Sequence, residues 1–102
     1  MSAIFYLKLI PPRPTFAMDM NDDERAIMMQ HVAYTRGHFD IGKVLIYGPV
    51  LADEGSFGMA VLDVADESEA RNLMENDPSV KAKLNTYEIW PMHLGGAQGR
   101  RS

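Results

Sequence analysis

The 102-residue chain contains no cysteine, which excludes disulfide bonds and any reaction that needs a thiolate. It also lacks an apolar run near the roughly 20 residues that a membrane-spanning helix requires. Basic residues are in the minority, with 10 lysines and arginines against 14 acidic residues and a net charge of -4. The only basic cluster, Arg100-Arg101, is too small for the basic face of a nucleic-acid-binding protein. We therefore expect binding to neither nucleic acid nor membranes.

The length bounds the organisation of the chain. We expect a single domain over residues 1–93, because a chain of this size buries one modest core, and a flexible, Gly-rich tail over 94–102. The N-terminal stretch MSAIFYLKLIPPRP has no basic start and reaches Pro11 early, so no secretory signal peptide is expected. Together with the missing cysteines, this favours a cytoplasmic protein.

Short stretches rich in β-branched and aromatic residues, bounded by turn residues, predict four strands. They cover residues 3–10, 43–50, 56–64 and 85–92. Residues 52–55, between the second and third strands, have the composition of a tight turn, so these two strands are expected to form a hairpin.

Two helices are expected between the strands. The first covers residues 22–40, with acidic residues in its first turn and a loosened turn near Gly37. The second begins at a cap on Asp66, with Glu69 three residues later in a capping-box pattern, and ends at Pro78. A further stretch, residues 11–21, contains three prolines and is expected to form a long loop.

The order βαββαβ predicts an α+β, ferredoxin-like fold with a four-stranded antiparallel sheet. Two helices cover only one face of such a sheet. On the first strand both faces are apolar, with Phe5, Leu7 and Leu9 on one and Ile4, Tyr6 and Ile10 on the other. An uncovered apolar face predicts a partner, and we expect a homodimer that packs its two open sheet faces together.

His31 lies near the middle of the first predicted helix, at the edge of its buried face. On a helical wheel it shares a mixed stripe with Glu24, Ile27, Met28, Thr35 and His38. Such a position fits the wall of a cleft. It also fits a half-buried histidine that is satisfied by a backbone carbonyl or by water.

Asp77 precedes Pro78 at the end of the second predicted helix. Aspartate followed by proline is a good start for a short helical turn, with the carboxylate as N-cap and the proline at the first helical position. This structural role explains the dipeptide without any function. It also leaves the carboxylate less free to orient an imidazole.

Several motifs together resemble the YCII-related family, which belongs to the dimeric α/β-barrel group of ferredoxin-like proteins. They are His31 with Tyr34, YGPV at 47–50, GSFGMAVLDV at 55–64, ESEARNLMENDP at 67–78 and YEIWPM at 87–92. The resemblance implies that His31 and Asp77 form a pair in a small pocket, with Gly48 and Pro49 at its rim. The 11–21 loop is longer than in the shortest members of the family.

The resemblance implies a cofactor-independent enzyme that acts on a small molecule, and aromatic compounds are among the candidate substrates. A carboxylate bonded to one imidazole nitrogen raises the basicity of the other, so His31 would act as general base and Asp77 would orient it. Elimination, isomerisation and hydrolysis all fit. Tyr34 and Phe57 are further candidates for the pocket lining, although single aromatic residues also serve in cores and interfaces. The alternative is a non-catalytic, ligand-binding or accessory dimer.

No metal or other cofactor is expected. His31 and His38 are seven residues apart on the predicted helix, or roughly 10 Å, which is too far to bind one ion. Gly55 and Gly58 follow no strand-to-helix turn, so a phosphate-binding loop is not expected either.

Overall fold

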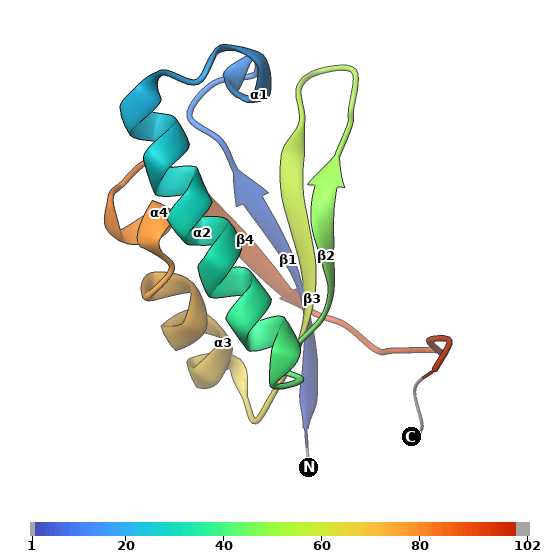
Figure 1. The fold of residues 1–102 in the computed structure, drawn as a ribbon. Helices are drawn as coiled ribbons and strands as arrows, with labels where there is room; N and C mark the ends of the chain where they lie inside the picture. The colour runs from blue at the N-terminus through green and yellow to red at the C-terminus, as the bar shows by residue number, and fades with distance from the viewer. Residues whose placement is uncertain (1, 100–102) are drawn as a thin grey trace.

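The computed structural model describes residues 2–99, which contain four strands and four helices. The strands are β1 (Ala3–Ile10), β2 (Val44–Val50), β3 (Phe57–Val64) and β4 (Thr86–Pro91). The helices are α1 (Phe16–Asp19), α2 (Asp22–Asp40), α3 (Glu67–Glu75) and α4 (Pro78–Lys81). The sheet is antiparallel throughout, in the order β2-β3-β1-β4, and the helices lie on one of its faces (Figure 1). This is the predicted ferredoxin-like α+β fold. Of the predicted tail, 94–102, residues 100–102 lie outside the described residues.

Local hydrogen bonds fix where the two long helices begin. At α2 the Asn21 side chain accepts from the Glu24 N–H, and the Glu24 carboxylate accepts from the Asn21 N–H, which completes a capping box. At α3 the box predicted for Asp66 and Glu69 is half formed. Asp66 accepts from the Glu69 N–H, but the Glu69 carboxylate accepts from the Ala65 N–H, one residue before the cap, and from the Lys43 ammonium.

Helix α2 runs unbroken through Gly37, so the loosened turn predicted there is wrong. A single glycine inside a helix lowers its stability but does not break it. The helix ends after Asp40, where Gly42 has a φ of 85° that a residue with a side chain rarely adopts.

The hydrophobic core lies between the sheet and the helices. Phe5, Leu7 and Leu9 of β1 are each 5% exposed and face it, as the alternation in the sequence predicted. At one end of β3 the large residues Leu62 and Val64 pack into this core. From α3 the core receives Ala70, Leu73 and Met74.

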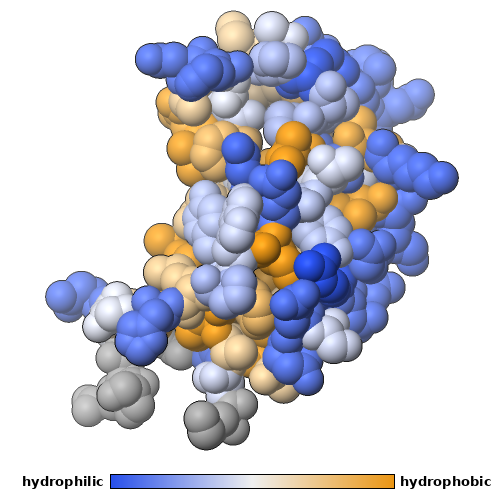
Figure 2. Space-filling view, turned by 180° about the vertical axis from the view of Figure 1, so that it is seen from behind, coloured by the Kyte–Doolittle hydropathy of each residue, from blue (hydrophilic) through white to orange (hydrophobic). Residues whose placement is uncertain are grey.

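The opposite face of the sheet carries no helix among the described residues. One row of side chains crosses all four strands there, in the order Ile46, Val61, Tyr6 and Trp90. The Tyr6 and Trp90 rings lie 5.8 Å apart, and Ile46 and Trp90 remain 56% and 46% exposed. Figure 2, which shows the molecule from behind, displays hydrophobic side chains in groups separated by hydrophilic ones.

Candidate functional site

A cavity of about 450 Å³ separates α2 from the sheet. Its floor includes Gly58 and Ala60 of β3, whose small size leaves a space that larger residues fill elsewhere along the strand. Its roof is α2, and none of the helix's 19 residues is fully buried, because the helix spans a hollow here. The volume is within the range of pockets that bind small molecules.

His31 projects from the roof of the cavity and meets Asp77. Its Nδ1 lies 2.7 Å from Asp77 Oδ2, and the two side chains are 17% and 2% exposed. Within residues 2–99, no hydrogen bond to the other ring nitrogen, Nε2, is formed. The sequence left open whether the two side chains meet, and they do. Since His31 lines the cavity, Nε2 is the nitrogen available to a bound molecule.

Asp77 serves the helix cap and the imidazole at once, by dividing its two oxygens between them. Oδ1 accepts hydrogen bonds from the backbone N–H and the hydroxyl of Ser79, both at 2.8 Å, and so caps α4. Oδ2 is left for His31. The structural and the orienting roles therefore do not compete.

Burial acts to raise the pKa of the Asp77 carboxyl, but its hydrogen bonds to His31 and Ser79 outweigh burial and hold the pKa below the usual value. Asp77 is therefore ionised near neutral pH. An ionised Asp77 places the proton of neutral His31 on Nδ1, which leaves the lone pair on Nε2.

The lowered pKa of Asp77 predicts an acid dependence of stability. The folded state binds this proton less tightly than the unfolded chain, so the contribution is complete above the ordinary pKa of 3.8 and is lost as pH falls through the lowered value. We expect the unfolding midpoint in urea to fall more steeply between about pH 5 and about pH 2 in the wild type than in Asp77→Asn, which cannot ionise. Equal slopes in the two proteins would contradict the lowered pKa.

Of the other residues predicted for the pocket, Gly48, Pro49 and Phe57 line the cavity. The Phe57 ring also contacts the Lys8 ammonium, 4.6 Å from its centroid. Tyr34 differs from the expectation and is not among the lining residues. One helical turn from His31, it points toward α3, where its hydroxyl donates a 2.6 Å hydrogen bond to the Leu73 carbonyl.

Among the lining residues that sequence reasoning missed, two groups bear on what the cavity can bind. One is Asn85, just before β4, whose side chain is buried at the cavity. The other is a set of methionines from three different elements or loops, Met20, Met28 and Met74. The methionine content of the chain is a signal for adaptable apolar surfaces, but nothing in the sequence places these three together.

The long 11–21 segment forms one end wall of the cavity, through Pro11, Phe16, Ala17 and Met20. This segment, predicted as a loop, contains the single turn of α1. Its prolines stop β1 and hold the chain away from the sheet, so that it crosses the end of the space beneath α2.

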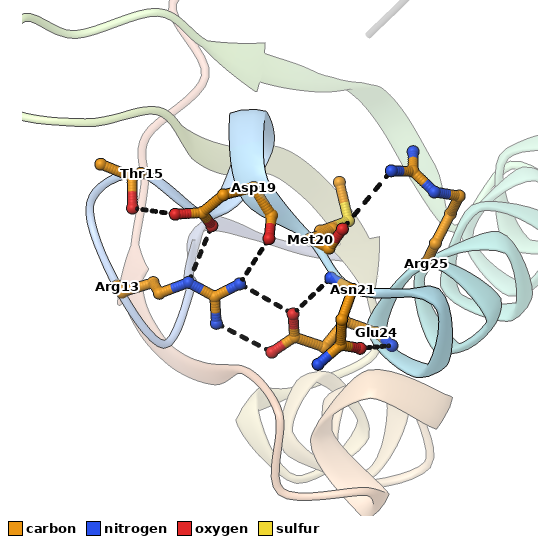
Figure 3. Close-up of polar contacts among 7 residues, drawn as sticks. All are labelled: Arg13, Thr15, Asp19, Met20, Asn21, Glu24 and Arg25. Carbon is orange, nitrogen blue, oxygen red and sulfur yellow. Dashed lines mark hydrogen bonds and ion pairs between the residues drawn. The ribbon is translucent and has the colours of Figure 1, made fainter.

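Arg13 ties this end wall to the start of α2 (Figure 3). Its guanidinium forms a two-pronged pair with the Glu24 carboxylate, at 2.7 and 2.8 Å, and a further bond to Asp19 at 2.8 Å. The Thr15 hydroxyl donates to the same Asp19 carboxylate at 2.6 Å. The Arg13 bonds, with the Asn21 N–H, lower the pKa of Glu24 to about 2. Arg13, Glu24 and Asp19 are therefore all charged near neutral pH, and their ion pairs hold the wall in place.

The tip of the β2–β3 hairpin closes against the same wall at Gly55. A Cβ at this position would lie 2.8 Å from the Pro14 carbonyl oxygen, and its φ is 136°, so only glycine fits. We expect Gly55→Ala to lower the free energy of unfolding by about 1–3 kcal/mol, measured by urea denaturation. Gly37→Ala is the matched control: it has open space and helical geometry, and should stabilise by about 0.5–1 kcal/mol. Equal effects of the two substitutions would contradict the close contact.

Within the described residues, no three histidine, aspartate or glutamate side chains gather as a metal site would require. In the same part of the chain, no helix has the length and hydropathy needed to cross a membrane.

The fold and the cavity define a ferredoxin-like domain with a histidine–aspartate pair in an apolar pocket. A model of the YCII-related domain matches residues 4–93, and the chain belongs to this family. Among solved structures, it is similar to 5-chloro-2-hydroxyhydroquinone dehydrochlorinase (TftG) from Burkholderia phenoliruptrix AC1100, in complex with 2,5-dihydroxybenzoquinone. The identity is 20%, the match covers 89% of this chain and 95% of the other, and the TM-score is 0.66. A comparison with curated proteins gave no match.

Proposed function

We propose that the protein is a cofactor-independent enzyme that moves a proton to or from a small molecule, with His31 as general base and Asp77 as its orienting partner. The observation that carries this proposal is the 2.7 Å contact between His31 Nδ1 and Asp77 Oδ2 at the wall of the cavity. A buried carboxylate that accepts from one imidazole nitrogen fixes the tautomer and raises the basicity of the other.

The arrangement suits a reaction in which a base removes a proton and an electron pair moves into a new double bond. In an elimination, Nε2 of His31 takes the proton, the freed electron pair forms the double bond, and the leaving group departs with its own bonding pair. Elimination is our first choice because the similar solved structure is named a dehydrochlorinase and holds a quinone. Isomerisation and hydrolysis use the same base in the same position.

The direct test measures chloride release from 5-chloro-2-hydroxyhydroquinone, together with proton exchange in D2O across a mixture of small aromatic and carbonyl compounds. Turnover or exchange that depends on His31 supports the enzyme. If compounds bind the cavity and none reacts or exchanges, the protein is instead a ligand-binding module, the second function that this cavity fits.

We further propose that two copies associate through the open sheet face. The row of Ile46, Val61, Tyr6 and Trp90 crosses all four strands and is apolar along its length. Its two end residues are about half exposed, so packing a second sheet against this face would remove apolar surface from water.

Sedimentation equilibrium tests the dimer. We expect a dimer for the wild type at micromolar concentration and a monomer for Ile46→Glu, because a carboxylate buried in the interface would lose its water without gaining a partner. Met29→Glu is the control, since Met29 is 69% exposed on α2 and lies away from this face. A monomeric wild type would refute the dimer, as would an effect of the control equal to that of Ile46→Glu.

A further inference from the structure

Asn85 is a buried amide whose hydrogen-bonding capacity is largely unused. It is 2% exposed, and its Oδ1 has no hydrogen-bond partner within residues 2–99. Its Nδ2 donates only to the Met28 thioether sulfur, at 3.3 Å, which is a weak acceptor. A buried amide oxygen without a partner destabilises a protein, so its retention needs an explanation.

The position of Asn85 connects this amide to the proposed base. Its backbone N–H bonds to the Ser79 carbonyl, and the Ser79 hydroxyl and N–H bond to Asp77. Its side chain reaches Met28, which precedes His31 by one helical turn on α2. Asn85, Met28 and His31 all line the cavity, so the amide and the imidazole belong to one wall.

The rest of the lining restricts the charge of a ligand. Among residues 2–99, no lysine or arginine lines the cavity, and its one carboxylate, Asp77, is already bonded to His31 and Ser79. An anion or cation would therefore give up its hydration without meeting an opposite charge. The methionine sulfurs, by contrast, make favourable contacts with aromatic rings.

We propose that the cavity takes an uncharged, ring-containing molecule with a hydroxyl group, and that Asn85 is the specificity-determining residue that accepts the hydroxyl hydrogen bond beside His31. An oxygen that lacks only a donor is satisfied by a hydroxyl and not by a carboxylate, a phosphate or a ketone. This inference rests on the same site as the proposed enzyme, and names its substrate class.

The test uses three probes that share one ring system and undergo no elimination. 2-Naphthol is uncharged near neutral pH and carries the hydroxyl, 2-naphthoate is of similar size and charged, and naphthalene has neither group. Titration calorimetry or ligand fluorescence gives the affinities. We expect 2-naphthol to bind at least about tenfold more tightly than 2-naphthoate, since the charge has no partner in the cavity.

Asn85→Leu should lower the ratio of 2-naphthol to naphthalene affinity by about tenfold, the worth of one hydrogen bond, while naphthalene itself binds as before. It should also raise the unfolding temperature, because it removes a buried unpaired oxygen. Asn72→Leu, on the exposed side of α3, is the matched control and should leave the ratio unchanged. Asn85→Ala provides the same ratio measurement should the leucine variant fail to fold.

Three results would overturn the inference: no binding of 2-naphthol up to its solubility limit, equal binding of 2-naphthoate, or an unchanged affinity ratio in the Asn85 variants. None of them depends on turnover. Selective binding of 2-naphthol by a protein that catalyses nothing would leave this inference standing and refute the proposed enzyme. Turnover that depends on His31, without the predicted selectivity, would do the reverse.

Discussion

Replacing Asp77 with alanine is expected to lower the free energy of unfolding by about 3–5 kcal/mol, more than either Gly55→Ala or Asp66→Ala. Asp77 is 1% exposed, and its removal leaves the Ser79 N–H and the His31 Nδ1–H without their acceptor. It also removes the N-cap of α4.

Asp66→Ala is the matched control, because Asp66 also caps a helix with its side chain but is exposed. Asp66→Ala should lower the free energy of unfolding by about 1 kcal/mol, the usual value for the loss of a helix cap. Urea denaturation followed by circular dichroism measures both. If Asp77→Ala destabilises the protein no more than Asp66→Ala does, the contact with His31 contributes nothing to folding. A double-mutant cycle with His31→Ala then gives the coupling between the two side chains.

The second large effect concerns His31 in catalysis. We expect His31→Ala to reduce turnover by about 10²–10⁴-fold, the contribution of a positioned general base. The reduction should appear in kcat rather than in KM, because the base acts in the transition state and most of the apolar lining is unchanged. Steady-state kinetics on the substrate found in the screen measures it.

Added imidazole separates a missing base from a disturbed fold. The alanine variant leaves space in the cavity wall where free imidazole can bind and accept the proton, so millimolar imidazole should restore part of the lost activity. His93→Ala, at an exposed histidine, should keep wild-type turnover and show no response to imidazole. An unchanged kcat in His31→Ala would remove this residue from the mechanism.

The fold was predictable from the sequence because its signals are local. The alternation in β1, the proline and glycine boundaries and the acidic start of α2 each act within a few residues, and the order of elements then leaves few topologies. Gly37 shows the limit of local reasoning. A glycine inside a helical pattern weakens the helix but does not end it, and the neighbouring Gly42, with its positive φ, ends it instead.

The site was predictable only in part because its geometry is tertiary. His31 and Asp77 lie 46 residues apart, and only their family pattern suggested that they meet. The sharing of Asp77 between Ser79 and His31 depends on the direction of each carboxylate oxygen, which a sequence does not encode locally. Tyr34 was predicted to line the pocket and Asn85 was not singled out, both for one reason: no periodicity tells which buried polar groups face a cavity and which face a neighbouring helix.

The long helix α2 has no fully buried residue, although it has 19 residues and lies across the sheet. It is joined firmly at its start, through the capping box and Arg13, and it spans a hollow farther along. A molecule bound in that hollow would therefore serve as a part of the interior that the polypeptide does not supply. A ligand that binds only the folded state would raise the stability of the fold by an amount that grows with its free concentration, so the lifetime of the protein in a cell would become linked to the supply of any compound that binds there.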